Sequence, residues 1–69
     1  MVKSELIIGY VVRNKDNSLD LHPIEPYKDI DRGHWDSSEC SMQLEEQMFP
    51  DVHWEDKYPL RVLITFNPI

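Results

Sequence analysis

Apolar residues are concentrated in two segments, residues 5–13 (ELIIGYVVR) and residues 59–66 (PLRVLITF), and mainly polar residues fill the region between them. Alternate residues of a β-strand point to opposite faces. The faces of the first segment are Leu6, Ile8, Tyr10 and Val12 on one side and Ile7, Gly9, Val11 and Arg13 on the other. Both faces are largely apolar, which predicts a strand covered on both sides. The second segment alternates most regularly, which predicts the last strand.

A β-hairpin is predicted directly after the first strand. Residues 14–18 (NKDNS) are typical of a turn, because Asn and Asp tolerate the left-handed region and bond to nearby backbone. Residues 19–23 resume the alternation, with Leu19 and Leu21 inward, so the hairpin has a five-residue loop. Pro26 then helps to end the strand, and residues 25–36 are predicted to form a loop with a short extended piece.

A short helix is predicted near residues 44–48. Residues 36–39 (DSSE) resemble a capping box, and Cys40, Leu44 and Met48 fall on one stripe of a helix. A competing interpretation makes residues 40–44 a short strand followed by a single helical turn. The predicted fold class is therefore α+β. We expect a single domain, residues 1–69, with a small antiparallel sheet of three to four strands, neighbouring end strands, and one short helix or helical turn.

The predicted sheet has more apolar surface than one short helix can cover. The helix can cover only one sheet face, so the second face needs another cover. Either the acidic loop of residues 25–36 or a second copy of the chain supplies it, and the latter would make a homodimer through the sheet. A chain this short has a thin margin of stability, which favours self-association, but the two alternatives stay open.

Charge and length exclude several classes of protein. The 69-residue chain has a net charge of −6, and 12 of its 13 acidic residues lie within residues 16–57. Its basic residues are dispersed, which disfavours direct nucleic-acid binding. Its apolar fraction of 41% is too high for a disordered chain. There is no 20-residue apolar run and no signal-peptide pattern, so we expect a cytoplasmic protein without a membrane span.

No motif indicates catalysis, a cofactor or a metal. The spacings of 12, 6 and 13 residues along His22, His34, Cys40 and His53 do not match the close ligand pairs of zinc sites. Residues 29–33 begin like a calcium loop, but the glycine comes at the fifth position instead of the sixth. Adjacent carboxylates such as those of residues 45–46 point apart, and no serine lies in a nucleophile elbow. We therefore predict that the protein is not an enzyme.

Several short motifs carry a resemblance. They are residues 13–19 (RNKDNSL), the pair Trp35 and Asp36, and residues 49–56 (FPDVHWED) before the last strand. With these motifs the chain resembles uncharacterised small acidic proteins of gut Bacteroidetes and of their phages and mobile elements. Asn17 stands where a turn glycine is more usual in that group. The resemblance implies an intracellular protein of phage or mobile-element type, and it implies no activity and no functional residues.

These observations predict a non-catalytic protein-interaction module with an acidic surface, whose partner is a protein, basic in character, or a second copy of the chain. Trp is enriched at interfaces, although core packing is the commoner role for each Trp in so small a domain. The alternative is a nucleic-acid mimic that inhibits a DNA-binding protein, which would need its carboxylates on one continuous face. The candidate protein-binding surface consists of Asp29, Asp31, Trp35, Asp36, Trp54, Glu55 and Asp56.

Overall fold

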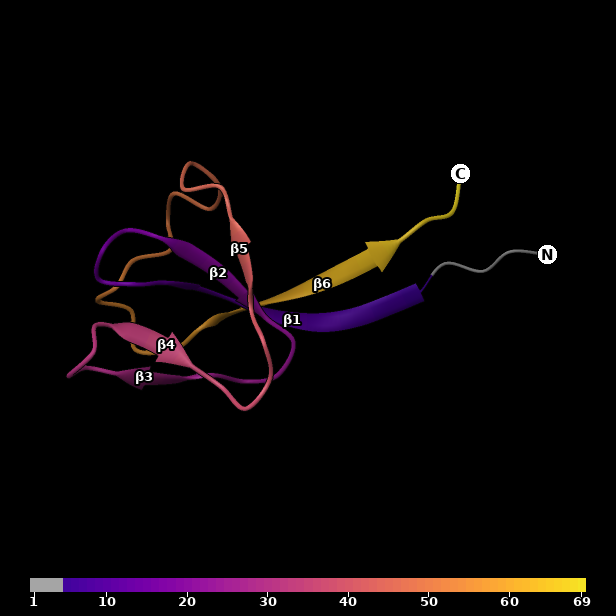
Figure 1. The fold of residues 1–69 in the computed structure, drawn as a ribbon. Helices are drawn as coiled ribbons and strands as arrows, with labels where there is room; N and C mark the ends of the chain where they lie inside the picture. The colour runs from indigo at the N-terminus through magenta and orange to yellow at the C-terminus, as the bar shows by residue number, and fades with distance from the viewer. Residues whose placement is uncertain (1–4) are drawn as a thin grey trace.

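The computed structural model describes residues 5–69, and residues 1–4 of the predicted domain lie outside the described residues. Within residues 5–69, six strands form two antiparallel sheets (Figure 1). The larger sheet has the strand order β5-β2-β1-β6, and the smaller one pairs β3 with β4. The strands are β1 Glu5–Arg13, β2 Leu19–His22, β3 Tyr27–Asp29, β4 His34–Asp36, β5 Met42–Leu44 and β6 Leu60–Phe66.

The hairpin of β1 and β2 confirms the sequence prediction. Arg13 pairs with Leu19, so the loop consists of residues 14–18. The Asn14 N–H donates to the Ser18 carbonyl at 2.8 Å and closes the loop. Asn17 has a φ of 78°, in the left-handed region that Asn tolerates better than most residues. A turn glycine is therefore not needed there.

The end strands pair with each other, as predicted, from Glu5↔Phe66 to Val11↔Leu60. The β2 strand pairs only with the second half of β1, from Tyr10 onward. The first half of β1 and the end of β6 therefore project from the rest of the molecule as a two-stranded arm (Figure 1). The Cα trace measures 48 × 26 × 17 Å along its principal axes, which reflects this projection. We call residues 5–9 and 62–66 the ribbon, and residues 10–61 the body.

Within the body, both faces of β1 are covered. Val11 lies in a buried cluster with Leu19 and Val52, which comes from the irregular segment 45–59. Val12 faces the opposite way and is 1% exposed, and on that side β4 packs against β1. The predicted two-sided cover of the first strand thus exists for its second half only, because the ribbon half is bare.

The α+β class is wrong, because residues 5–69 contain no helix and are all-β. The helix predicted near residues 44–48 is absent: Leu44 ends β5, where it pairs with Leu19 of β2, and a turn follows. The competing interpretation, a short strand within residues 40–44, is confirmed by β5. Pairing with an existing sheet satisfies the backbone and packs Leu44 on the core, whereas the rest of the predicted stripe, Cys40 and Met48, is exposed. The predicted loop of residues 25–36 also contains a second sheet, β3–β4.

The segment 45–59 covers the core as a series of turns. Turn hydrogen bonds run from Met48 N to Glu45 O, from Val52 N to Phe49 O and from Asp56 N to His53 O. Arg13, only 6% exposed, holds this segment. Its guanidinium donates to five backbone carbonyls at 2.8–3.1 Å, those of Asn17, Glu46, Met48, Phe49 and Val52. The four carbonyls of the segment 45–59 thus accept from a side chain that lies far away in sequence, which favours turns over a continuous helix.

Candidate functional site

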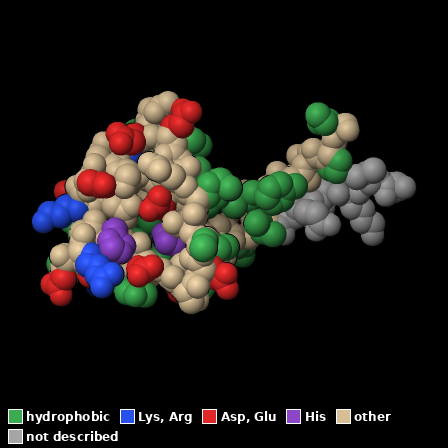
Figure 2. Space-filling view, viewed as in Figure 1, with side chains coloured by type: hydrophobic (Ala, Val, Ile, Leu, Met, Phe, Trp, Pro, Cys, Tyr) green, Lys and Arg blue, Asp and Glu red, His purple; other side chains and the backbone are tan. Residues whose placement is uncertain are grey.

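The ribbon exposes large apolar side chains on both faces. Ile7 and Ile8 of β1 are each 45% exposed, and Leu63 and Phe66 of β6 are 65% and 55% exposed. Figure 2 shows apolar side chains grouped along the ribbon, which projects from the body. These exposed fractions correspond to roughly 450 Å² of apolar surface on the ribbon. The largest apolar patch on a typical monomer measures about 300–600 Å². The patch of this chain lies within that range and is concentrated on the narrow ribbon. Such patches are often functional.

One face of the ribbon is a continuation of the core. Ile7, Gly9 and Val11 alternate onto the same face of β1, and their β6 partners Ile64 and Val62 lie beside them. A Cβ built on Gly9 would lie 2.8 Å from the Cδ1 atoms of both Ile64 and Leu21. The glycine therefore lets these two side chains lie directly over β1. The apolar stripe then runs from the covered core out to the bare ribbon without a break.

A shallow groove of about 420 Å³ lies where the ribbon joins the body, and its walls are mainly apolar. Its lining comes from the ribbon, from β2 and from the start of β5. The lining residues are Ile7, Leu21, His22, Pro23, Cys40, Ser41, Met42, Ile64 and Phe66. Met42 is 62% exposed, so the groove is open to solvent along β5.

The outer edge of β6 is open. Among the described strands β6 has a single neighbour, β1. Within residues 5–69, no turn, loop or cap hydrogen bond between backbone groups involves Leu60–Phe66. An edge strand presents a row of unpaired N–H and C=O groups to which another strand can add. Arg61 is the one charged residue of this strand. One face of β6 is wholly apolar (Leu60, Val62, Ile64 and Phe66), and the other carries Leu63 between Arg61 and Thr65.

The sequence-predicted acidic surface lies on the body, and the structure brings its two parts together around Lys28. The Lys28 ammonium lies 4.6 Å from the ring centre of Trp54 and 5.2 Å from that of Trp35. It also donates to the carbonyls of Trp54 and Asp56. Trp35 is 5% exposed, so its ring packs inside the body, whereas Trp54 is half-buried. A cation thus already occupies the space between these two Trp side chains.

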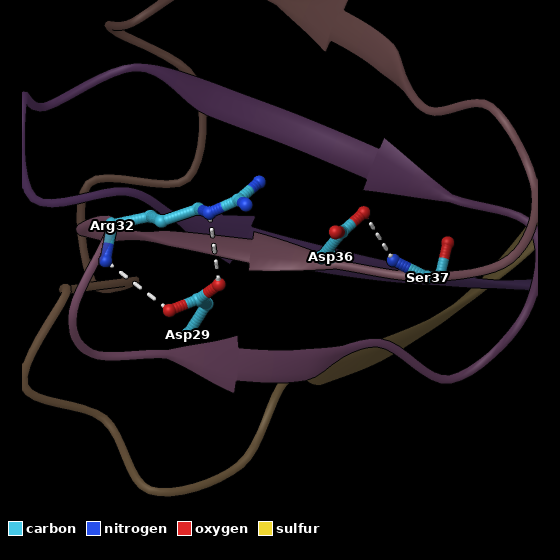
Figure 3. A network of polar contacts seen from close by, with 4 residues as sticks. All are labelled: Asp29, Arg32, Asp36 and Ser37. Atoms are coloured by element: carbon cyan, nitrogen blue, oxygen red, sulfur yellow. Dashed lines mark hydrogen bonds and ion pairs between the residues drawn. The ribbon is translucent and has the colours of Figure 1, made fainter.

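Three of the five carboxylates of this surface make local contacts, those of Asp29, Asp36 and Asp56, and Figure 3 shows the first two. Asp29 Oδ1 accepts from the Arg32 backbone N–H at 3.1 Å, and its Oδ2 lies 3.7 Å from Arg32 Nε. Asp36 Oδ1 accepts from the Ser37 N–H at 2.8 Å. Asp31 and Glu55 are exposed. The contacts of Asp29 and Asp36 stabilise turns of the β3–β4 hairpin and its exit, and they leave fewer free carboxylates than the sequence suggests.

Acidic groups on the body are interspersed with groups of other kinds. In the view of Figure 2, Asp and Glu side chains are separated by Lys, Arg, His and uncharged groups over the body, and they do not form an uninterrupted stripe. Phosphates in a nucleic acid repeat at regular, close spacing. The visible arrangement therefore gives the nucleic-acid mimic no specific support.

His22 and Ser37 form the other notable polar pair, beside a hollow of about 450 Å³. Burial lowers the pKa of His22 below its ordinary 6.5, and the carboxylates of Asp20 and Asp36 oppose that shift. Ser37 Oγ lies 3.0 Å from His22 Nδ1 and donates its proton to the Glu39 carbonyl at 2.9 Å. The hydroxyl therefore accepts from His22. A nucleophile needs the opposite arrangement, in which the histidine takes the hydroxyl proton.

Neither a metal site nor a membrane-spanning helix is found among residues 5–69. Within residues 5–69, no three His, Cys, Asp or Glu side chains are grouped so that they could hold a metal ion. Cys40, the only cysteine, is exposed. In the same part of the chain, no helix has the length and apolar character needed to cross a membrane.

Comparison of the chain with protein-family models, with curated proteins and with solved structures finds no match in any of the three. Function must therefore be argued from the site itself. Sequence reasoning placed the candidate surface on the acidic segments and assigned no binding role to Ile8, Leu63 and Phe66. The signal that could have indicated them was present, because both faces of the first strand are apolar and the expected helix could cover only one of them.

Proposed function

We propose that this chain is a non-catalytic protein-interaction module of the cytoplasm, which binds an extended, apolar polypeptide segment along β6. The observation that carries the proposal is the open edge of β6 on a ribbon with two exposed apolar faces. Strand addition to a sheet edge is a common mode of peptide recognition. Main-chain hydrogen bonds supply affinity in this mode, and alternate side chains on the two faces supply specificity.

The chemistry of the ribbon restricts the partner segment. Leu63 and Ile8 offer apolar contacts on one face, and Ile64 and Phe66 offer them on the other. A matching segment would therefore be apolar at alternate positions on both sides, and free of proline at its centre. Arg61 adds a single positive charge, so a segment with an acidic or neutral end fits better than a basic one.

In this proposal the acidic body is not the contact surface. Its net negative charge keeps the protein in solution and repels nucleic acid. The predicted acidic surface is largely occupied by its own contacts, because Lys28 lies over both Trp rings and Arg32 lies against Asp29. Within residues 5–69, β1 is the one strand that pairs with β6, so the outer edge of β6 has no strand partner there. We therefore favour the ribbon as the contact surface.

The experiment measures binding of a fluorescent peptide by anisotropy. The peptide carries the β6 sequence LRVLITF between neutral glutamine residues, and a matched peptide has proline in place of the central leucine. We expect the first peptide to bind and the second to bind at least about tenfold more weakly, because proline cannot donate to the ladder.

Two protein variants decide which surface is used. Leu63→Lys should abolish binding, because a charge on an edge strand opposes strand addition. Glu55→Gln changes the predicted acidic surface and should leave binding unchanged. If Glu55→Gln removes binding while Leu63→Lys preserves it, the acidic surface is the site. If neither peptide binds, the proposed strand addition is wrong.

A further inference from the structure

We propose that the segment bound along β6 is β6 of a second copy, so that two chains form a symmetric dimer through antiparallel pairing of their edge strands about Leu63. This inference rests on the proposed function, because it names the partner for the same open edge. The β6 strand lies at the end of the strand order β5-β2-β1-β6. Pairing it with its own copy would give a continuous eight-stranded antiparallel sheet with the two-fold axis through its centre.

The β6 sequence is complementary to itself in this register. When Leu63 faces Leu63 of the second copy, Val62 faces Ile64 and Leu60 faces Phe66, so apolar residues meet apolar residues. Arg61 faces the uncharged Thr65, so no like charges meet. Directly opposite residues of an antiparallel pair share a face, and these cross-strand contacts stabilise the pairing. The register also preserves the two apolar faces of each ribbon.

Charge does not oppose this dimer, although each chain carries a net charge of −6. Leu60 lies next to the body and Phe66 lies near the tip of the ribbon. Antiparallel pairing therefore places the two acidic bodies at opposite ends of the paired strands. Seven residues of strand separate them by about 20 Å, which exceeds the screening length of about 8 Å at physiological ionic strength. A dimer through the acidic bodies would lack this separation.

The area available indicates a weak dimer. The two ribbons together expose roughly 900 Å² of apolar surface, which is below the 1,200–2,000 Å² of standard interfaces. Edge pairing covers part of this area and adds main-chain hydrogen bonds. A dissociation constant in the micromolar range follows, on the order of 10⁻⁶–10⁻⁴ M. Because the interface is small, the dimer should form and separate within an accessible range of protein concentration.

The test is the mass of the full chain in solution, measured by sedimentation equilibrium from about 1 µM to 500 µM. We expect a monomer at the low end and a dimer at the high end. Leu63→Lys and Leu63→Glu should each raise the dissociation constant at least about tenfold, because like charges would then face each other across the axis. An equimolar mixture of the two variants should dimerise again, within about threefold of the original constant, because opposite charges then meet.

Ile8→Lys is the matched control. Ile8 lies beside Leu63 on the same face of the ribbon, and it is also exposed. In the proposed dimer it lies two strand spacings, about 10 Å, from Leu63 of the second copy, and three spacings from the equivalent Ile8. Its substitution should therefore change the dissociation constant less than about threefold, and a mixture of Ile8→Lys with Ile8→Glu should show no rescue.

Each contrary result overturns a defined part of the inference. A monomer at every concentration refutes the dimer, and peptide binding by that monomer would leave the proposed function standing. A dimer that Ile8→Lys disrupts as strongly as Leu63→Lys packs through ribbon faces, which refutes edge pairing. Loss of the dimer in both Leu63 variants without rescue in the mixture refutes pairing about Leu63. Absence of both the dimer and peptide binding refutes the inference and the proposed function together.

Discussion

Replacing Arg13 with methionine should remove most of the folding free energy of this chain. Arg13 lies at the end of β1, on the face that carries Val11, and its guanidinium is buried against the segment 45–59. Four of its five hydrogen bonds go to carbonyls of that segment, and one goes to Asn17 in the β1–β2 loop. Methionine retains much of the side-chain volume and removes every donor. The four carbonyls would then lose their partner.

The magnitude follows from the number of bonds and from the size of the protein. A hydrogen bond to a charged group contributes about 1.5–3 kcal/mol, but five bonds from one group are not additive. The segment can also detach and let water solvate its carbonyls, which limits the loss to about 3–5 kcal/mol. A domain of 69 residues has a total stability of about 3–10 kcal/mol. The variant should therefore be marginally folded. Arg13→Lys keeps the charge with three donors in place of five, so it should lose about half as much.

The assay is urea unfolding, followed by Trp fluorescence at a protein concentration below that of self-association. Hydrogen exchange of the Met48 and Val52 amides reports local release of the segment, because both amides donate in its turns. Arg32→Met is the control: its side chain is 73% exposed and its ion pair with Asp29 spans 3.7 Å. Such surface pairs contribute at most about 1 kcal/mol. The reasoning is refuted if Arg13→Met and Arg32→Met have the same unfolding free energy within about 0.5 kcal/mol.

Three smaller predictions concern single side chains. Burial lowers the pKa of His22, so its contribution to stability is complete above pH 6.5 and declines as the pH falls below that value; His22→Gln should flatten this part of the stability–pH curve. Lys28→Met should cost about 1–3 kcal/mol in urea unfolding and change Trp54 fluorescence, because it removes two hydrogen bonds and the stacked cation. Asn17→Ala should destabilise the protein by about 1 kcal/mol at its positive φ, whereas Asn17→Gly should not; equal stability of the two variants would contradict the left-handed turn.

The parts of the fold that sequence reasoning predicted correctly depend on local pattern. The alternation of Leu19 and Leu21 and the turn-forming residues 14–18 define the first hairpin, because both act over a few neighbouring positions. The prediction of a helix was wrong for the opposite reason. The stripe of Cys40, Leu44 and Met48 is present, but Leu44 pairs across the sheet with Leu19, which lies 25 positions away. A non-local pairing of this kind overrides a local periodicity and leaves no signal within the segment itself.

The apolar character of the candidate site, the ribbon, was predictable from the sequence, but its position at the edge of the sheet was not. Two apolar faces on the first strand indicated that another surface must cover them. The neighbouring end strands were predicted, but the sequence could not specify that β6 lies at the edge of the sheet, because strand order depends on contacts between distant segments. Arg13 could have been recognised earlier. Alternation places it on the inward face with Val11, and a buried arginine requires several acceptors.

The ribbon is bare because the segment that covers the core, residues 45–59, lies over the body. With no helix or disulfide among the described residues, the segment 45–59 is held on the sheet by its carbonyls, through Arg13 at one end and Lys28 at the other. The attached segment packs over Val11 and Leu19, and β6 begins directly after it. Of the described residues, only 67–69 follow β6, and Ile8 and Leu63 stay exposed. Ile8 and Leu63 face each other in the β1–β6 pairing, and their contact stabilises it by about 0.2–1 kcal/mol. It leaves the two residues 45% and 65% exposed, and the proposed association along the ribbon would cover this apolar surface.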